Sequence, residues 1–205
     1  MTDEWKEKKT RVFSPEANEH FVEPHWVNKR FFDIELTDEA LRVHDPMAGW
    51  GRITEAALVA GHDATGSDLI EDRYTPHEFS TFWQHHTDRW SAGDFFEETR
   101  EFDAIVCNPA FTLHKRFAIH ALTLAPYVAM IMPVRKLNSA HWMEELPIVR
   151  VWLLTPRPSM PSGSYIASGG KVGGGTVDFC WVVFDKHDPN AGAGFPVMGW
   201  MHRDG

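Results

Sequence analysis

The motif NPAF, residues 108–111, directly follows a short apolar run and gathers groups that suit a planar amine. The side chain of Asn108 offers a carbonyl oxygen. Pro109 offers a backbone carbonyl, and its own nitrogen carries no hydrogen that could act as a donor in the turn. These two oxygens can accept the two hydrogens of an NH2 group while the ring of Phe111 stacks on the substrate plane. We therefore predict that Asn108, Pro109 and Phe111 are catalytic residues that act on an amino or amide nitrogen.

An amino group conjugated to a ring is a poor nucleophile because its lone pair is delocalised into the ring. Hydrogen-bond acceptors aimed at its hydrogens favour the tetrahedral, positively charged nitrogen of an alkyl-transfer transition state. Correct positioning of the reactants then supplies much of the remaining rate, and no strong general base is required. The alternative for the same residues is a strand-ending Asn-Pro turn followed by a core phenylalanine.

A glycine turn follows a strand-like run in the sequence HDPMAGWG, residues 44–51. Gly49 and Gly51 permit a tight turn and a close approach of the backbone to a ligand. The third glycine of a dinucleotide fingerprint is replaced by Thr54, and no Walker phosphate loop is present. The turn predicts a small-molecule site, with an ordinary strand–helix turn as the alternative.

Two carboxylates stand at the ends of the next two predicted strands. Asp68 ends the run DATGSD, where α/β nucleotide folds hold two ribose hydroxyls on one acceptor group. Asp94 of AGDFF can accept a hydrogen bond from an adenine amino group, with Phe95 available to pack on the ring. Singly, Asp68 could be a helix N-cap and Asp94 a turn residue, but in this order they predict a nucleoside site.

Alternating strand and helix patterns place these residues at one edge of a sheet. The strand-like runs are apolar without alternation, which is typical of a parallel sheet covered on both faces. Two later runs, 149–156 and 177–185, are separated by a Gly/Ser-rich stretch and predict an antiparallel pair at the edge of the sheet, joined by a mobile loop. The earlier predicted strands are 42–45, 63–68, one ending near 92, 104–107 and 127–134, with helices at 53–62 and 115–125 and a short helix or covering loop within 71–90.

Length and composition indicate a single domain at 21–205 after a flexible polar tail at 1–20. The chain has 205 residues, 43% of them hydrophobic, but no apolar run long enough to cross a bilayer, so we expect a cytoplasmic protein without a membrane partner. The two cysteines are far apart, and the histidines, including His77, His85 and His86, lack metal-ligand spacing, so no metal is expected.

The order DPMAGWG, Asp68, GDFF and NPAF resembles class I S-adenosylmethionine-dependent methyltransferases that modify amino nitrogen. It is especially similar to DNA adenine-N6 methyltransferases with motifs of the form (N/D)PP(F/Y). The stretches TPRPSM and GGGTVDFCWVVFD resemble the C-terminal hairpin of small phage and prophage members. The resemblance covers most of residues 22–185 and implies a Rossmann-like α/β fold, a mostly parallel doubly wound sheet ending in an antiparallel hairpin.

The resemblance implies S-adenosylmethionine as cofactor and assigns its contacts. Ala110 departs from the usual second proline of the motif, and Glu23 stands where a threonine is common. A carboxylate at 23 would face the carboxylate of the cofactor unfavourably, so from this N-terminal segment only Pro24 is carried over. The implied cofactor contacts are Pro24, Asp45, Pro46, Met47, Ala48, Gly49 and Gly51 for the methionine part, Asp68 and Leu69 for the ribose, Asp94 and Phe95 for the adenine, and Asn108.

Methylation of adenine in a duplex requires the base to be flipped out and the surrounding phosphates to be held. The substrate contacts expected are therefore Phe111 and the nearby cations Lys115, Arg116, Arg135, Lys136 and Arg157. The net charge of −9 argues against a protein that coats nucleic acid, and about 60 residues after the last parallel strand leave little room for a recognition domain.

DNA is the favoured partner, with RNA possible because the catalytic pocket meets the same base. A protein glutamine amide is a further alternative substrate, although the segment before the glycine turn is short for the helical substrate domain that such enzymes carry. A non-catalytic methyltransferase-fold subunit is the remaining alternative.

Overall fold

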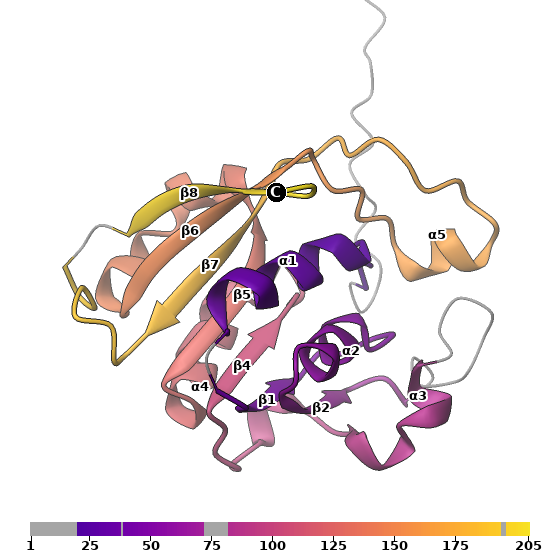
Figure 1. Cartoon of the computed structure of the whole chain (residues 1–205), viewed down its shortest axis with the longest axis horizontal. Helices are drawn as coiled ribbons and strands as arrows, with labels where there is room; N and C mark the ends of the chain where they lie inside the picture. The colour runs from indigo at the N-terminus through magenta and orange to yellow at the C-terminus, as the bar shows by residue number, and fades with distance from the viewer. Residues whose placement is uncertain (1–19, 38, 72–81, 194–195) are drawn as a thin grey trace, which may run out of the picture.

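The computed structural model describes residues 20–37, 39–71, 82–193 and 196–205. Nearly all of the predicted N-terminal tail, and His77, lie outside these residues. The described chain forms one mixed sheet with the strand order β3-β2-β1-β4-β5-β7-β6-β8 (Figure 1). The first five strands are parallel to one another and span β1 Arg42–Asp45, β2 Asp63–Asp68, β3 Trp90–Ala92, β4 Ala104–Cys107 and β5 Tyr127–Pro133.

Helices cover both faces of the sheet, as the unbroken apolar strands predict. All residues of β4 and β5 are buried, and successive side chains point to opposite faces. Ala104 and Val106 pack in the cluster that holds α1 and α2, whereas Ile105 and Cys107 pack in the cluster that holds α4. The helices are α1 His25–Glu35, α2 Arg52–Val59, α3 Phe82–His85, α4 His114–Leu124 and α5 Gly163–Ala167, with short 3₁₀ turns at Thr87–Arg89, Phe95–Glu97, Val134–Ser139 and His141–Glu145.

The C-terminal third forms the predicted antiparallel pair. Strand β7, Phe179–Asp185, lies between β5 and β6, Ile148–Thr155, and is antiparallel to both. The sheet continues one strand further, because β8, Val197–His202, pairs parallel with β6 and forms the outer edge. The sequence of β8, VMGWMH, is largely apolar, but most of its side chains are exposed in the fold.

The Gly/Ser-rich connection between β6 and β7 contains α5, which the sequence pattern did not predict. The hydroxyl of Ser162 caps this helix by accepting a hydrogen bond from the backbone N–H of Tyr165 at 3.3 Å. Ser162 also forms an isolated antiparallel bridge with Phe21. The connection is therefore attached to the N-terminal segment that precedes α1.

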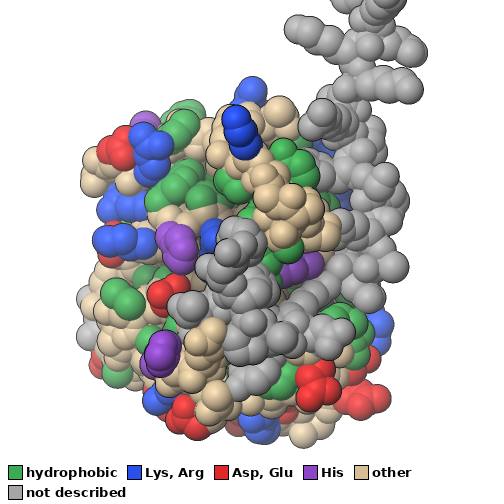
Figure 2. All heavy atoms as spheres, turned by 90° about the vertical axis from the view of Figure 1, so that its right-hand side faces the viewer, with side chains coloured by type: hydrophobic (Ala, Val, Ile, Leu, Met, Phe, Trp, Pro, Cys, Tyr) green, Lys and Arg blue, Asp and Glu red, His purple; other side chains and the backbone are tan. Residues whose placement is uncertain are grey.

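No helix in the described part of the chain is long and apolar enough to cross a membrane. Figure 2 shows one face of the molecule, on which Lys and Arg side chains lie close to Asp and Glu side chains. No broad area of a single charge is visible on that face, in keeping with a chain of 20 basic and 29 acidic residues.

Candidate functional site

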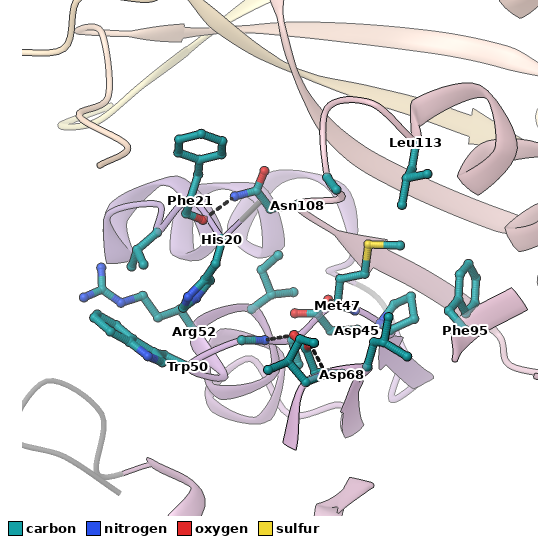
Figure 3. Close-up of a pocket in the computed structure, with 18 of the residues that line it drawn as sticks. His20, Phe21, Asp45, Met47, Trp50, Arg52, Asp68, Phe95, Asn108 and Leu113 are labelled. Carbon is teal, nitrogen blue, oxygen red and sulfur yellow. Dashed lines mark hydrogen bonds between the residues drawn. The ribbon is translucent and has the colours of Figure 1, made fainter. Parts of the chain in front are cut away.

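A cavity of about 870 Å³, open mouth included, lies at the carboxyl ends of β1, β2 and β4 (Figure 3). This edge is where ligands bind in open α/β sheets. Most of the predicted cofactor contacts line it, namely Asp45, Pro46, Met47, Ala48, Gly49, Asp68, Leu69, Asp94, Phe95 and Asn108.

The glycine turn after β1 forms the floor of the cavity. Gly49 and Gly51 have φ angles of +48° and +79°, a region that residues with a Cβ atom rarely adopt. The N–H of Ala48 donates to the carbonyl of Ser67 at 2.9 Å, which ties the turn to β2. The N–H of Gly49 donates to Oδ2 of Asp68 at 3.0 Å, so the turn and this carboxylate form one unit.

The two later carboxylates both accept backbone hydrogen bonds. Oδ1 of Asp68 accepts from the N–H of Ile70 at 3.0 Å. Oδ1 of Asp94 accepts from the N–H of Phe96 at 2.9 Å and caps the 3₁₀ turn that follows. Phe95 is buried at the cavity wall, where its ring packs against Phe117.

Asp45, at the end of β1, is a fully buried acid in the cavity wall. Burial, followed by the nearby carboxylate of Glu23, holds the pKa of the Asp45 carboxyl well above its usual range. Burial, together with Asp45, likewise raises the pKa of the Cys107 thiol. Asp45 therefore holds its proton to higher pH than an exposed aspartic acid does, and in that form it can donate a hydrogen bond at the cavity wall.

Asn108 follows β4 and its amide is held in one orientation. Nδ2 donates to the backbone carbonyl of Phe21 at 3.0 Å and to Oε2 of Glu23 at 2.9 Å. In Figure 3 the amide nitrogen points toward Phe21 and the amide oxygen points the other way. Oδ1 is buried and has no hydrogen-bond partner among the described residues.

Phe111 does not line the cavity, and neither does Pro109. The ring of Phe111 is stacked on the ring of Phe21, with centroids 4.9 Å apart and planes 7° apart. Lys136 donates from Nζ to the backbone carbonyl of Phe111 and lies 5.9 Å from the centre of its ring. Phe111 therefore presents a face that accepts a parallel aromatic ring, at present that of Phe21.

Two predicted cofactor residues, Gly51 and Pro24, are not among the residues that line the first cavity. Gly51 is the N-cap of α2, and Pro24 is the N-cap of α1. Pro24 lines a second, neighbouring cavity beneath α5, which shares Val22 and Arg52 with the first. Both residues can shape the first cavity only through the backbone that they hold.

The predicted basic residues differ in their position relative to the cavity. Arg116 lies over the ring of Phe96, 3.5 Å from its centre, and so stands at the rim of the cavity that Phe96 lines. Lys136 lies beside Phe111. Lys115 precedes Arg116 in α4, Arg135 precedes Lys136 in the 3₁₀ turn after β5, and both are exposed. Arg157 is instead paired with Asp178 at 2.5 Å.

Several cavity residues were missed by the sequence analysis: His20, Phe21, Val22, Glu23, Trp50, Arg52, Ile53, Ile70, Phe96, Ala110 and Leu113. The most polar of them are Glu23 and Arg52, which precede α1 and begin α2. Nη1 of Arg52 donates to the backbone carbonyl of Glu23 at 2.6 Å. The sequence did contain a signal for Glu23, because FVEP, residues 21–24, resembles an N-terminal cofactor segment of the methyltransferases. From that segment only Pro24 was predicted as a contact, and Glu23 was not. Within the part of the chain that is described, no group of three or more His, Cys, Asp or Glu residues could hold a metal ion.

The sequence matches no protein-family model and no curated protein. The fold is similar to the M protein of the type I restriction enzyme EcoKI, with a TM-score of 0.60 and 13% identity over 87% of this chain and 46% of that one. The type I restriction-modification methyltransferase subunit of Streptococcus thermophilus has a TM-score of 0.55 and 12% identity, over 83% of this chain and 46% of that one.

Magnesium protoporphyrin IX methyltransferase of Synechocystis, solved with S-adenosylmethionine bound, has a TM-score of 0.54 and 12% identity over 78% of each chain. This chain spans less than half the length of the two restriction-modification subunits. These similarities give it the Rossmann-like fold of class I methyltransferases, confirming the predicted mostly parallel sheet with an antiparallel pair toward its end.

Proposed function

We propose that this protein transfers a methyl group from S-adenosylmethionine to an exocyclic amino nitrogen, most directly N6 of adenine in DNA. The observation that carries the proposal is Asn108, whose amide nitrogen is fully used while its buried oxygen has no partner among the described residues. A buried acceptor without a donor is costly, and an amine hydrogen would satisfy it.

The cavity fits the proposed cofactor in shape and charge. Asp68 and Asp94 line the cavity, where their carboxylates suit ribose hydroxyls and an adenine amino group respectively. S-adenosylmethionine supplies a methyl group on a positively charged sulfur, and the carboxylate of Glu23 in the cavity wall favours that charge. Arg52, whose Nη1 donates to Glu23, is the cation in the wall that can bind the cofactor carboxylate.

The residues after β4 supply what an amine acceptor needs. Oδ1 of Asn108 and the backbone carbonyl of Pro109 accept the hydrogens of the amine and stabilise the positive charge that develops on nitrogen. The cavity wall would hold the amine opposite the sulfur–methyl bond of the cofactor, so that the N–C bond would form as the C–S bond breaks and the neutral thioether leaves. Because the nitrogen gains its bond before it must lose a proton, no group in the wall has to act as a strong base.

A planar aromatic amine is favoured over a protein amide by the stacking of Phe111. Its ring already carries a parallel aromatic ring at 4.9 Å, so a purine can take the same position once Phe21 moves aside. Lys136 lies beside the Phe111 ring and Arg116 lies over Phe96 at the rim of the cavity, so both can contact phosphates. DNA is preferred to RNA only because the motif order is most similar to that of DNA adenine methyltransferases.

The decisive experiment is methyl transfer from labelled S-adenosylmethionine to duplex DNA, structured RNA and cell-extract protein in separate reactions. We expect N6-methyladenine in the DNA, identified by nucleoside mass spectrometry. Label in RNA adenine would move the substrate to RNA, and label in protein glutamine would replace the aromatic amine by an amide. Binding of the cofactor without transfer to any of the three would indicate a non-catalytic subunit.

A further inference from the structure

The carboxylate of Glu23 lies between two buried amides. Its Oε2 accepts from Nδ2 of Asn108 at 2.9 Å, and its Oε1 accepts from Nδ2 of Asn28 at 2.9 Å. Glu23 is 7% exposed and Asn28, in the first turn of α1, is fully buried. Each carboxylate oxygen thus has its own amide donor, and the carboxylate is held from both sides.

An ionised carboxylate only accepts hydrogen bonds, so it can bind the NH2 end of an amide but not the oxygen end. The backbone carbonyl of Phe21, which receives the other hydrogen of Asn108 at 3.0 Å, has the same restriction. If the Asn108 amide were reversed, its oxygen would face two other oxygens and two hydrogen bonds would be lost. These two neighbours therefore determine which end of Asn108 is left for a substrate.

We propose that Glu23 is a positioning residue that keeps the carbonyl oxygen of Asn108 available to the substrate amine, an inference that rests on the proposed amine transfer. An amide in the reversed orientation would offer a donor to a donor and could not bind the NH2 group. Phe21 contributes through its backbone, so Glu23 is the side chain through which this orientation is controlled.

The position of Glu23 is itself tied to the cofactor turn. Arg52 is the first residue of α2, directly after the glycine turn, and donates from Nη1 to the Glu23 carbonyl at 2.6 Å. On the other side, Pro24 is the N-cap of α1, and its carbonyl accepts from the N–H of Val27 at 3.0 Å. The turn, the orienting carboxylate and the amine acceptor are therefore linked through short hydrogen bonds.

The first test is Glu23→Gln, which keeps the size of the side chain but offers either end of an amide to Asn108. Because both orientations of Asn108 become possible, we expect kcat to fall about twofold or more as the reversed amide is populated, while the Kd for S-adenosylmethionine changes less than about 1.5-fold. The matched control is Glu55→Gln, because Glu55 is half exposed, contacts His25 and lies outside the cavity. Urea unfolding of both variants checks that they fold.

The second test reverses the direction of the hydrogen bond. Asn108→Asp alone faces the Glu23 carboxylate with another carboxylate and should lose most activity. Glu23→Gln in the same chain supplies an NH2 group to Asp at 108 and again leaves a carboxylate oxygen for the amine. We expect kcat of the double variant to exceed that of Asn108→Asp at least about tenfold. If Glu23 acted only through stability, the two losses would multiply, and a double variant no better than Asn108→Asp overturns the inference.

Side-chain amide NMR separates this inference from the proposed function. We expect the Nδ2 hydrogens of Asn108 to exchange slowly with water compared with those of the exposed Asn138, and to lose this protection in Glu23→Ala. Protected hydrogens in a protein that transfers no methyl group contradict the proposed function and leave the orientation supported. Methyl transfer with an unprotected Asn108, or with unchanged kcat in Glu23→Gln, overturns the role of Glu23.

Discussion

Asn108 shows how one side chain can carry two tasks through the two ends of its amide. The nitrogen end is bound to oxygens of the N-terminal segment, at 2.9 and 3.0 Å, and anchors that segment at the end of β4. The oxygen end is the group that the proposed reaction uses. Removal of this side chain should therefore affect the reaction far more than the cofactor cavity, whose glycine turn and Asp68 are bonded to each other independently.

We expect Asn108→Ala to lower kcat at least about 100-fold, the size of effect seen when one polar group of a transition-state site is lost. Binding of S-adenosylmethionine, measured by calorimetry, should change by less than about fivefold. Turnover near that of the unaltered protein would contradict the assignment of Asn108. A loss of cofactor affinity as large as the loss of kcat would instead indicate that Asn108 mainly supports the cavity.

Asp45 has a pKa well above its usual range because it is buried, so folding makes it hold its proton to higher pH. Its contribution to stability is present below the unfolded pKa of about 3.9 and is lost as the pH rises toward the folded value. Asp45→Asn removes this dependence. We expect the stability of Asp45→Asn relative to the unaltered protein to increase from pH 4 to pH 7 by more than about 1 kcal/mol.

Urea unfolding at several pH values measures this difference. The control is Asp33→Asn, because Asp33 lies on the exposed side of α1 and is paired with Lys29 at 2.7 Å. A difference between Asp45→Asn and the unaltered protein that stays constant from pH 4 to pH 7 would mean that Asp45 is ionised in the folded chain.

At the scale of elements, the strand–turn–helix unit from β1 to α2 shapes the cavity. Its two glycines have positive φ, and the helix begins with Gly51 in the left-handed region. A Cβ atom at Gly51 would lie 2.5 Å from the ring of Phe82 and 2.7 Å from that of Trp83. The unit therefore requires glycine for its backbone and for the space that α3 occupies.

Gly51→Ala and Gly61→Ala separate these two requirements, since Gly61 also has a positive φ, of +96°, but no atom within 4 Å of a built Cβ. We expect Gly61→Ala to cost about 1 kcal/mol of unfolding free energy from backbone strain alone. Gly51→Ala should cost at least about 1 kcal/mol more because of the added contact with α3.

Calorimetric binding should then show at least about fivefold weaker binding of S-adenosylmethionine to Gly51→Ala and unchanged binding to Gly61→Ala. Equal stability losses in the two variants would mean that α3 yields to the new methyl group. Equal cofactor affinities would show that the conformation of Gly51 does not affect the shape of the cavity.

At the scale of the whole molecule, an acidic protein must bind its proposed substrate through local positive charge. The net charge is −9, and acidic and basic side chains are mixed on the face in Figure 2. Arg52 lines the cavity itself, and the cations near its rim include Arg116, over Phe96, and Lys136, beside Phe111, with Lys115 exposed next to Arg116. Binding should accordingly be weak in general and sensitive to these few residues.

We expect Lys115→Glu to raise the KM for DNA and to reduce the dependence of log KM on log salt concentration by about 1 or more. The control is Lys29→Glu on α1, which packs on the opposite face of the sheet from α4. Steady-state kinetics from low to moderate salt measures both. A KM that changes equally in the two variants would show that overall charge, and no local basic rim, governs binding.

Local patterns were sufficient for most of the architecture. The predicted strand at 104–107 coincides with β4, and the predicted strands at 42–45 and 63–68 coincide with β1 and β2. Strand β4 is a short apolar run ended by Asn-Pro, whereas β1 and β2 contain several polar residues and are marked by the glycines that border them. Strand β8 was missed although its sequence VMGWMH is largely apolar, and helix α5 was missed because it lies in a glycine-rich stretch.

The same holds for the site: residues in motifs at strand ends were predictable, because the carboxyl ends of parallel strands converge whatever their partners are. Tertiary structure alone decided that Glu23, 85 positions before Asn108 in the chain, accepts a hydrogen bond from its amide. It likewise decided that Phe111 is stacked on Phe21 and does not line the cavity. Such contacts depend on where an irregular segment runs across a finished sheet, and no periodicity in the chain encodes that path.

The NPAF motif thus indicated the groups available for chemistry, whereas the fold determined how they are used. Residue type sets what Asn108 can donate and accept, and this is already contained in the chain. Which of its two ends is consumed by the protein and which remains for a substrate depends on the acceptors placed around it. That choice comes from the packing of the segment before α1 against the end of β4.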